Sequence, residues 1–179
     1  MSFYSSGQSS HSVSRKLDRG MLGEELVAQW LRQQGWQIIE QRWRCRWGEL
    51  DIIAMRTSDL TDVHSGLCPI LIFVEVKTRG RGNWDRDGLL AVTEAKQAKL
   101  WQTAEMFLGD RPDLADYSCR FDVALVRCNS TTRDDSHLRV LSPQEQLSNL
   151  TIKPGHPILL SGYQLILQDY IASAFVNDS

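Results

Sequence analysis

The sequence predicts an α/β fold whose core elements follow one another in the order α-β-β-β-α-β. Two patterns carry this prediction: apolar residues recur at helical spacing in segments 21–34 and 93–108, and side chains of two kinds alternate strictly in segment 42–47. The composition, with 42% hydrophobic and 23% charged side chains in 179 residues, is typical of one globular domain that buries a sizeable core.

The first helix is predicted over residues 21–34, and Gly35 provides a typical stop signal at its carboxyl end. Glu24 lies at the margin of the apolar stripe of this helix, whereas Glu25 lies with Arg32 on the opposite, solvated face. Two adjacent glutamates are therefore expected to have different surroundings.

Three strands are predicted after the first helix. Residues 36–47 are extended, with arginines on one face and Trp or Cys on the other, and residues 49–55 form the second strand. The polar segment 56–69 is typical of a hairpin loop or an insertion. Residues 70–78 are apolar enough to lie inside a sheet.

The second half of the chain predicts a helix over residues 93–108 and a fourth strand over 120–128. Two short strands are then expected, at residues 137–141 and 163–168, with a short final helix over residues 170–175.

The domain organisation follows from these elements. We predict a disordered, serine-rich leader over residues 1–19 and a single domain over 20–179, with a core at about 20–128 and a decorated C-terminal part at 129–179. The longest apolar run, residues 70–74, is far shorter than a membrane span, and the leader has no secretory signal. A cytoplasmic protein without a membrane partner is expected.

The net charge of −2 at first argues against a nucleic-acid partner. The acidic surplus, however, lies within residues 129–179, and the rest of the chain is balanced. If some of the acids in this balanced part bind a metal ion, the metal neutralises them and the electrostatic field of the remaining charges is positive. The net charge therefore does not exclude a nucleic-acid partner.

The strongest chemical signal is an E-x-K triplet within residues 73–79. On a strand, Glu75 and Lys77 project from the same face of an otherwise apolar element. An acid and a base in such surroundings are costly unless each finds a partner. An ordinary cross-strand ion pair is the commonest explanation of an isolated triplet.

A second carboxylate, Asp51, lies in another apolar strand and makes an ordinary ion pair a less sufficient explanation. An antiparallel neighbour would bring Asp51 within a few ångströms of Glu75, with Lys77 beside them. Two carboxylates at that distance repel each other, and a divalent cation with oxygen ligands relieves the repulsion. Mg²⁺ prefers one or two carboxylates plus waters and phosphate oxygens. A nearby lysine then acts on the attacking water or on the charge of the phosphate.

An aspartate followed by E-x-K, with a glutamate on the preceding helix, resembles the PD-(D/E)xK nuclease superfamily. Longer blocks resemble the YraN-type family, an uncharacterised bacterial group similar to archaeal Holliday-junction resolvases. These blocks are residues 23–31, 42–51, 73–79 and 120–123, with a weaker likeness at 171–175. The resemblance implies a restriction-endonuclease-like αβββαβ core, with a mixed sheet and helices on its faces.

The resemblance also implies a Mg²⁺-dependent endonuclease, with Mn²⁺ as an alternative, that hydrolyses DNA phosphodiesters, including those of branched, Holliday-junction-like structures. Asp51 and Glu75 match its metal-binding acids, and Lys77 matches its catalytic lysine. Glu24 matches the helical glutamate that supports the metal, often through water. Glu49 is a further acid on the face of Asp51.

Arginines supply candidate contacts to a nucleic-acid backbone. The row of Arg42, Arg44 and Arg46 is explained equally well by phosphate binding and by a solvated strand face. Arg79 and Arg81 follow the E-x-K strand directly and are better placed to meet a backbone.

Four other side chains have two explanations each. Trp43 and Trp47 have the shape to stack on bases, but the face they share with Cys45 favours the core. Lys96 and Lys99 open the second helix, where a solvated surface is favoured over a supporting role at the site.

Three classes of function stay open: a metal-dependent nuclease, a nucleic-acid-binding module on the same fold without turnover, and a protein-interaction domain in which E-x-K is an ion pair. The expected partner in the first two is nucleic acid, with DNA foremost. A symmetric homodimer would suit an enzyme that cuts junctions. Asp122 falls in one of the resembling blocks, but a structural hydrogen-bonding role is favoured for it.

Overall fold

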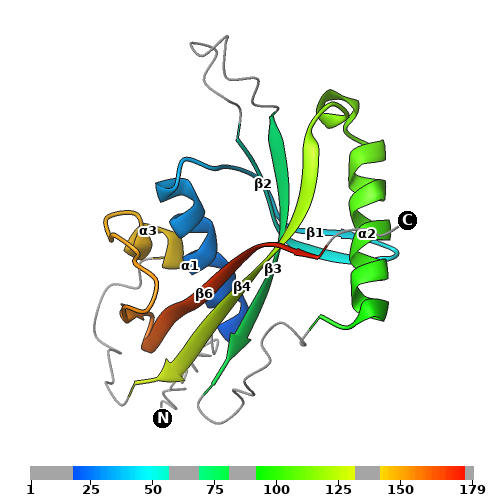
Figure 1. Cartoon of the computed structure of the whole chain (residues 1–179). Coiled ribbons are helices and arrows are strands. Elements are labelled where there is room, and N and C mark those ends of the chain that lie inside the picture. Colours follow the sequence, from blue (N-terminus) through cyan, green and yellow to red (C-terminus); the bar gives the residue numbers. More distant parts are fainter. Residues whose placement is uncertain (1–17, 57–68, 81–91, 132–141, 176–179) are drawn as a thin grey trace, which may run out of the picture.

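The computed structural model describes residues 18–56, 69–80, 92–131 and 142–175. Its centre is a six-stranded mixed sheet with the strand order β1-β2-β3-β4-β6-β5. Strands β3 and β4 run parallel, and every other neighbouring pair is antiparallel. Helix α1 and the short helix α3 lie on one side of the sheet and α2 lies on the other (Figure 1). The predicted α/β class and the αβββαβ order are confirmed.

The helices and strands have the following bounds: α1 Arg19–Gln33, β1 Gln37–Cys45, β2 Gly48–Arg56, β3 Ile70–Arg79, α2 Glu94–Gly109, β4 Ser118–Ser130, α3 Pro143–Leu147, β5 Ile158–Leu160 and β6 Tyr163–Phe175, with a 3₁₀ turn at Pro112–Leu114. Helix α1 begins before residue 21 because the side chain of Asp18 caps it, accepting a hydrogen bond from the backbone N–H of Gly20 at 2.9 Å. Helix α2 is capped by Thr93.

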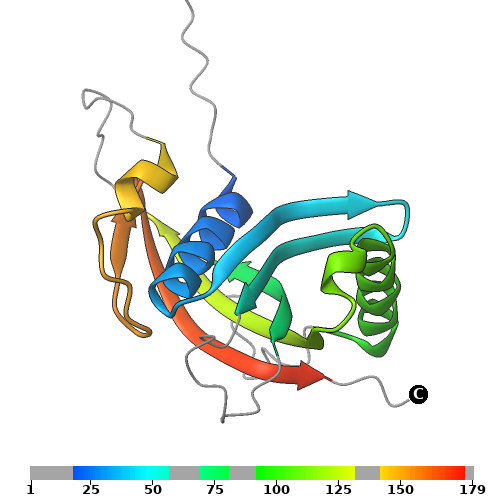
Figure 2. The ribbon, with the colours of Figure 1, turned by 90° about the horizontal axis from the view of Figure 1, so that it is seen from above.

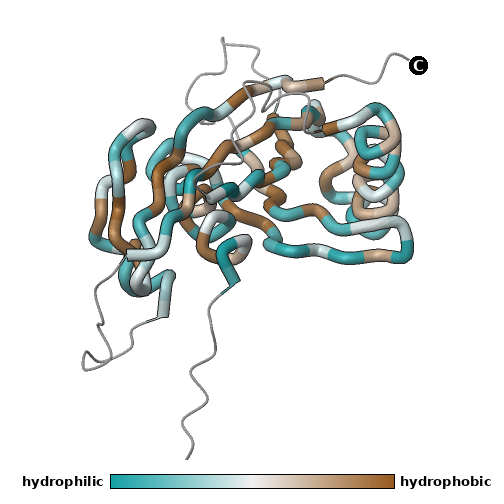
Figure 3. The backbone as a smooth tube through the Cα atoms, turned by 90° about the horizontal axis from the view of Figure 1, so that it is seen from below, coloured by the Kyte–Doolittle hydropathy of each residue, from teal (hydrophilic) through white to brown (hydrophobic). Residues whose placement is uncertain are grey.

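Two hydrophobic cores lie on the two faces of the sheet. Alternate residues of β3 divide between them: Ile72 and Val74 pack with α1, whereas Leu71 and Phe73 pack with α2. Figure 3 shows hydrophobic segments along the central strands. A central strand buried on both faces explains why segment 70–74 is continuously apolar.

The predicted final helix over residues 170–175 is wrong, because this segment continues β6 and pairs antiparallel with β4. The fully buried carboxylate of Asp122 on β4 holds it in place. That carboxylate accepts hydrogen bonds from the Tyr170 hydroxyl at 2.6 Å and from the Ser173 backbone N–H at 2.8 Å. An isolated helix of six residues is marginal, whereas pairing extends an existing sheet. The structural role predicted for Asp122 is confirmed.

Several predictions lie outside the described residues: residues 1–17 of the leader predicted over 1–19, most of the 56–69 loop, the strand at 137–141 and the side chain of Arg81. The leader prediction is wrong for residues 18 and 19, because Asp18 caps α1 and Arg19 begins it. Within the described ranges, no helix is long and apolar enough to cross a membrane.

Candidate metal and nucleic-acid site

The sheet opens at the position of Asp51. The ladder between β2 and β3 has its last pair at Ile52 and Val74. Beyond that pair, the Oδ2 atom of Asp51 accepts the backbone N–H of Val76 at 2.7 Å, so a side chain takes the place of a strand partner. Two strands that separate around a carboxylate leave space beside it.

A strained residue lies opposite Asp51 on β1. The ladder pairs on either side of this position are Gln41 with Ile52 and Trp43 with Leu50. Arg42, between them, has a φ of +56°, in the left-handed region that arginine rarely adopts. The pleat changes face here, because Ile52 packs in the core of α1 and Leu50 in the core of α2. The kink thus places Asp51 where strand β2 passes from one core to the other.

Glu75 lies beside this opening and is only 5% exposed. Its Oε1 atom accepts hydrogen bonds from two ammonium groups, Lys77 Nζ on the same strand and Lys96 Nζ in the first turns of α2. The solvated surface favoured for Lys96 is therefore wrong. The sequence contains one signal for this placement, the Thr93 cap that starts α2 three residues earlier, but the packing of α2 on the sheet is a tertiary feature.

The buried charges shift one another's pKa values. Burial, and then the charge of Glu75, raises the pKa of Asp51 to about 7, although the hydrogen bond from Val76 opposes the change. Burial also lowers the pKa of Lys77, against the stabilising hydrogen bond to Glu75. The ionised form of Asp51 would therefore gain from a further nearby cation.

Glu24 and Glu49 are paired with arginines next to the opening. Arg42 Nε lies 3.2 Å from Glu24 Oε2 and 3.3 Å from Glu49 Oε1, and Arg44 Nη2 lies 3.0 Å from the same Glu49 oxygen. Burial raises the pKa of Glu24. Within the described part of the chain, no group of three or more acidic, histidine or cysteine side chains is arranged to hold a metal ion. The negative charge of Glu24 contributes to the raised pKa of Asp51.

Helix α1 is held close to the site by Gly23. A Cβ atom at this position would lie 2.0 Å from Thr78 Oγ1 on β3. Glycine lets the helix approach the strand that carries Lys77. Glu24, the next residue, is therefore placed by a backbone contact.

Asp51 and Glu75 line a pocket of about 450 Å³ together with Lys96, Lys99 and Trp47. The core position predicted for Trp47 is wrong, since β1 ends before it and a two-residue turn leaves the indole 45% exposed. Figure 2 shows this hairpin of β1 and β2 extending towards α2.

Trp43 fits the core prediction. It packs against the core of α2, and its ring meets the edge of Phe107 at a centroid distance of 5.4 Å.

The predicted arginines lie in two places. Arg44 and Arg46 are exposed near the tip of the hairpin, where Arg46 stacks over Trp47 at 5.0 Å from the ring centroid. Arg79 is exposed at the end of β3. All three remain accessible to a partner, and Arg44 already carries the ion pair with Glu49.

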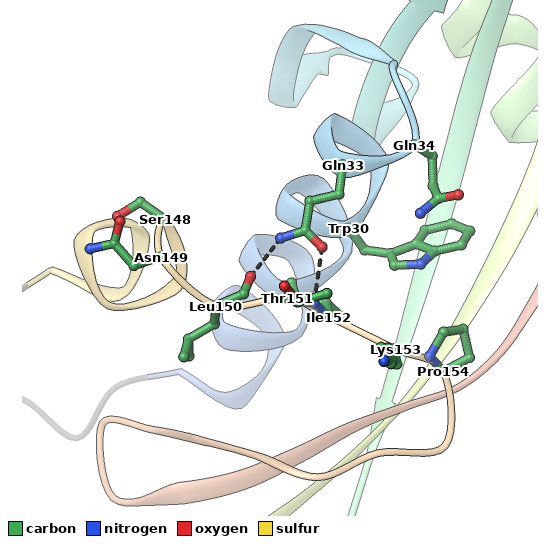
Figure 4. A pocket seen from close by; sticks show the side chains of 10 residues that line it. All are labelled: Trp30, Gln33, Gln34, Ser148, Asn149, Leu150, Thr151, Ile152, Lys153 and Pro154. Atoms are coloured by element: carbon green, nitrogen blue, oxygen red, sulfur yellow. Dashed lines mark hydrogen bonds between the residues drawn. The ribbon is translucent and has the colours of Figure 1, made fainter.

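A larger pocket, of about 620 Å³, lies between the end of α1 and residues 148–154 (Figure 4). The side chain of Gln33 bridges its walls, donating to the Leu150 carbonyl at 2.5 Å and accepting from the Ile152 N–H at 2.9 Å. None of its ten lining residues is an acid, a histidine or a cysteine. The smaller pocket, which is lined by Asp51, Glu75 and Lys96, is therefore the better candidate for a catalytic or metal-binding site.

Comparison with known proteins gives a consistent result. The model of an uncharacterised protein family, UPF0102, matches residues 23–126. A UPF0102 protein of Trichodesmium erythraeum is 60% identical over 98% of both chains. One from Acaryochloris marina is 50% identical over 90% of this chain and 92% of its own. A third, from Synechocystis sp., is 42% identical over 88% and 97%. These names specify no activity.

Proposed function

The chain belongs to the uncharacterised protein family UPF0102, and from the geometry of its site we propose that it is a metal-dependent endonuclease that hydrolyses DNA phosphodiesters. One observation carries the proposal: two carboxylates, one buried and one half-buried, line a pocket where the sheet opens, and a lysine contacts the buried one. Asp51 comes from β2, and Glu75 and Lys77 come from β3. A structural ion pair requires no second carboxylate at this point.

The donor set fits Mg²⁺ or Mn²⁺. Asp51 and Glu75 are hard oxygen ligands that repel each other, and a site with one or two carboxylates leaves positions for water and phosphate oxygens. These two residues would hold the ion, with Glu24 supporting them from α1. A bound divalent ion polarises the phosphate and makes a coordinated water more acidic.

Lys77 and Lys96 have different roles in the proposed reaction. Lys77 is the more buried, with a side chain 13% exposed, and its lowered pKa suits Nζ to accept the proton of the attacking water. Lys96 is 40% exposed on the pocket wall. Its ammonium group is placed to balance the charge that develops on the phosphate.

A non-catalytic nucleic-acid-binding module is the alternative. It is favoured by the two ammonium groups on Glu75, which already neutralise that carboxylate without a metal ion. A module of this kind would bind nucleic acid with strong salt dependence and would not cut it.

A nicking assay separates the two functions. The wild-type chain is incubated with linear duplex, single-stranded and four-way-junction DNA in Mg²⁺ or Mn²⁺, beside Lys77→Ala and Asp51→Asn. The nuclease predicts cleavage by the wild type and a loss of at least about 1000-fold in both variants. Calorimetric titration should show weakened metal binding in Asp51→Asn.

DNA binding and melting temperature are the controls, and neither should change greatly in Lys77→Ala. A wild-type chain that binds these DNAs but cuts none of them with either metal would establish the binding module instead.

A further inference from the structure

We infer that Trp47 stacks on a nucleic-acid base, so that the pocket takes strands whose bases are unpaired beside the phosphate it holds. This inference rests on the proposed function and adds the class of substrate to it. It depends on the exposure of one indole, on the way that indole is held, and on the groups beside it.

The indole of Trp47 is unusual in its exposure. Among the tryptophans of the described ranges, it alone is classed as exposed, at 45%, while the others are buried or half-buried in the two cores. Burying an indole stabilises a fold, so one left in water on a pocket wall has its apolar surface available to a partner.

The hairpin turn holds this indole at the pocket. Cys45 and Gly48 pair across the turn, and the backbone N–H of Trp47 donates to the Cys45 sulfur at 3.4 Å. A Cβ atom on Gly48 would lie 3.1 Å from Thr103 Oγ1, so the hairpin packs closely on α2. Trp47 thus lines the same pocket as Asp51, which is four residues further along the chain.

The groups around Trp47 suit a strand of nucleic acid. The guanidinium of Arg46 lies 5.0 Å from the indole centroid and brings a positive charge next to the ring. Lys96 and Lys99 line the same pocket. An aromatic face among cations that track a phosphate backbone is the usual arrangement for binding unpaired bases.

The geometry of the nucleic acid gives the selectivity. In the interior of a duplex both faces of each base are covered by its neighbours, so an indole gains no face to stack on. An unpaired base in a single strand, a gap or a junction offers one. Stacking of one base changes affinity by about 5- to 150-fold.

The test measures affinity without catalysis. Labelled oligonucleotides of one sequence are titrated in EDTA by fluorescence anisotropy, as single-stranded DNA, single-stranded RNA, blunt duplex and duplex with a short gap. The proteins are the wild type, Trp47→Ala, Trp47→Phe and Met106→Ala. Met106 is a matched control, since it is 38% exposed on α2 and does not line the pocket.

Trp47→Ala should lose about 5-fold or more in affinity for the single strands and the gapped duplex, with blunt-duplex binding unchanged. Trp47→Phe should retain most of the affinity, and Met106→Ala all of it. The loss of affinity in Trp47→Ala is compared for single-stranded DNA and single-stranded RNA, and the nucleic acid with the larger loss is the preferred one.

Equal losses on blunt and unpaired substrates, no loss on any substrate, or no binding of single strands by the wild type would each overturn the inference. Cleavage is absent in EDTA, so this result is independent of the nicking assay. A chain that cuts DNA but shows no such loss would remain a nuclease without base stacking.

Discussion

Two aspartates of the sheet are surrounded very differently. Asp122 on β4 is fully buried and receives hydrogen bonds from three groups, the Arg120 guanidinium, the Tyr170 hydroxyl and the Ser173 N–H. Asp51 on β2 accepts a backbone hydrogen bond from Val76 and has another carboxylate as its neighbour. A charge with matched partners holds a fold together, whereas a charge without them is poised to take a ligand.

The largest expected effect on stability comes from breaking the well-partnered site. Asp122→Ala leaves the half-buried Arg120 guanidinium and Tyr170 hydroxyl without their acceptor. We expect the free energy of unfolding to fall by about 3 kcal/mol, measured by urea denaturation.

Asp113→Ala is the matched control, because Arg111 and Asp113 form the same Arg-x-Asp pair in an exposed position. It should cause no measurable change. Equal effects at the two sites would show that burial of Asp122 contributes little.

The second effect has the opposite sign. Asp51 has a pKa raised to about 7 in the fold, against an ordinary value of 3.8, so the folded protein holds this proton more tightly than the unfolded chain. Ionising Asp51 therefore destabilises the metal-free fold as the pH rises from about 4 to about 7. Asp51→Asn should remove this loss and stabilise the protein by roughly 2 kcal/mol at pH 8 in EDTA.

Thermal melting of both proteins at pH 4, 6 and 8 checks the sign. The two melting temperatures should be closest at pH 4 and diverge up to about pH 7. Adding Mg²⁺ should stabilise the wild type and leave Asp51→Asn unchanged. A variant less stable than the wild type in EDTA at pH 8 would contradict this account of Asp51.

The smallest effect concerns one hydrogen bond at the well-partnered site. Tyr170→Phe removes the hydroxyl that donates to Asp122, while the ring keeps its contact with Trp30 at a centroid distance of 4.7 Å. Stability should fall by about 1 kcal/mol in urea denaturation. A fall as large as that of Asp122→Ala would mean that Tyr170 supplies most of the stabilisation of that carboxylate.

The sequence was sufficient to predict which strands carry the three candidate residues of the site. Asp51, Glu75 and Lys77 lie on apolar strands, where a period of two residues fixes the face of each side chain. The antiparallel pairing of β2 with β3 then brings the acids together.

The failures have a tertiary cause. Lys96 reaches Glu75 because α2 packs across the sheet, and no local pattern reports where a helix packs. Segment 170–175 is a strand because Asp122, far away in sequence, holds it. Trp47 is exposed because the alternation of residues 42–47 ends at a turn that its side chains do not signal.

The contact between Gly23 and Thr78 has a consequence for genetics. A Cβ atom at residue 23 would lie 2.0 Å from Thr78 Oγ1, so either the Thr78 side chain would have to move or α1 would have to shift and carry Glu24 with it. A random-mutagenesis screen for inactive alleles should therefore recover substitutions of Gly23 beside those of the acids, although this residue has no functional group. Residue 23 would then look catalytic in a mutational map while its role is to set the spacing between two elements.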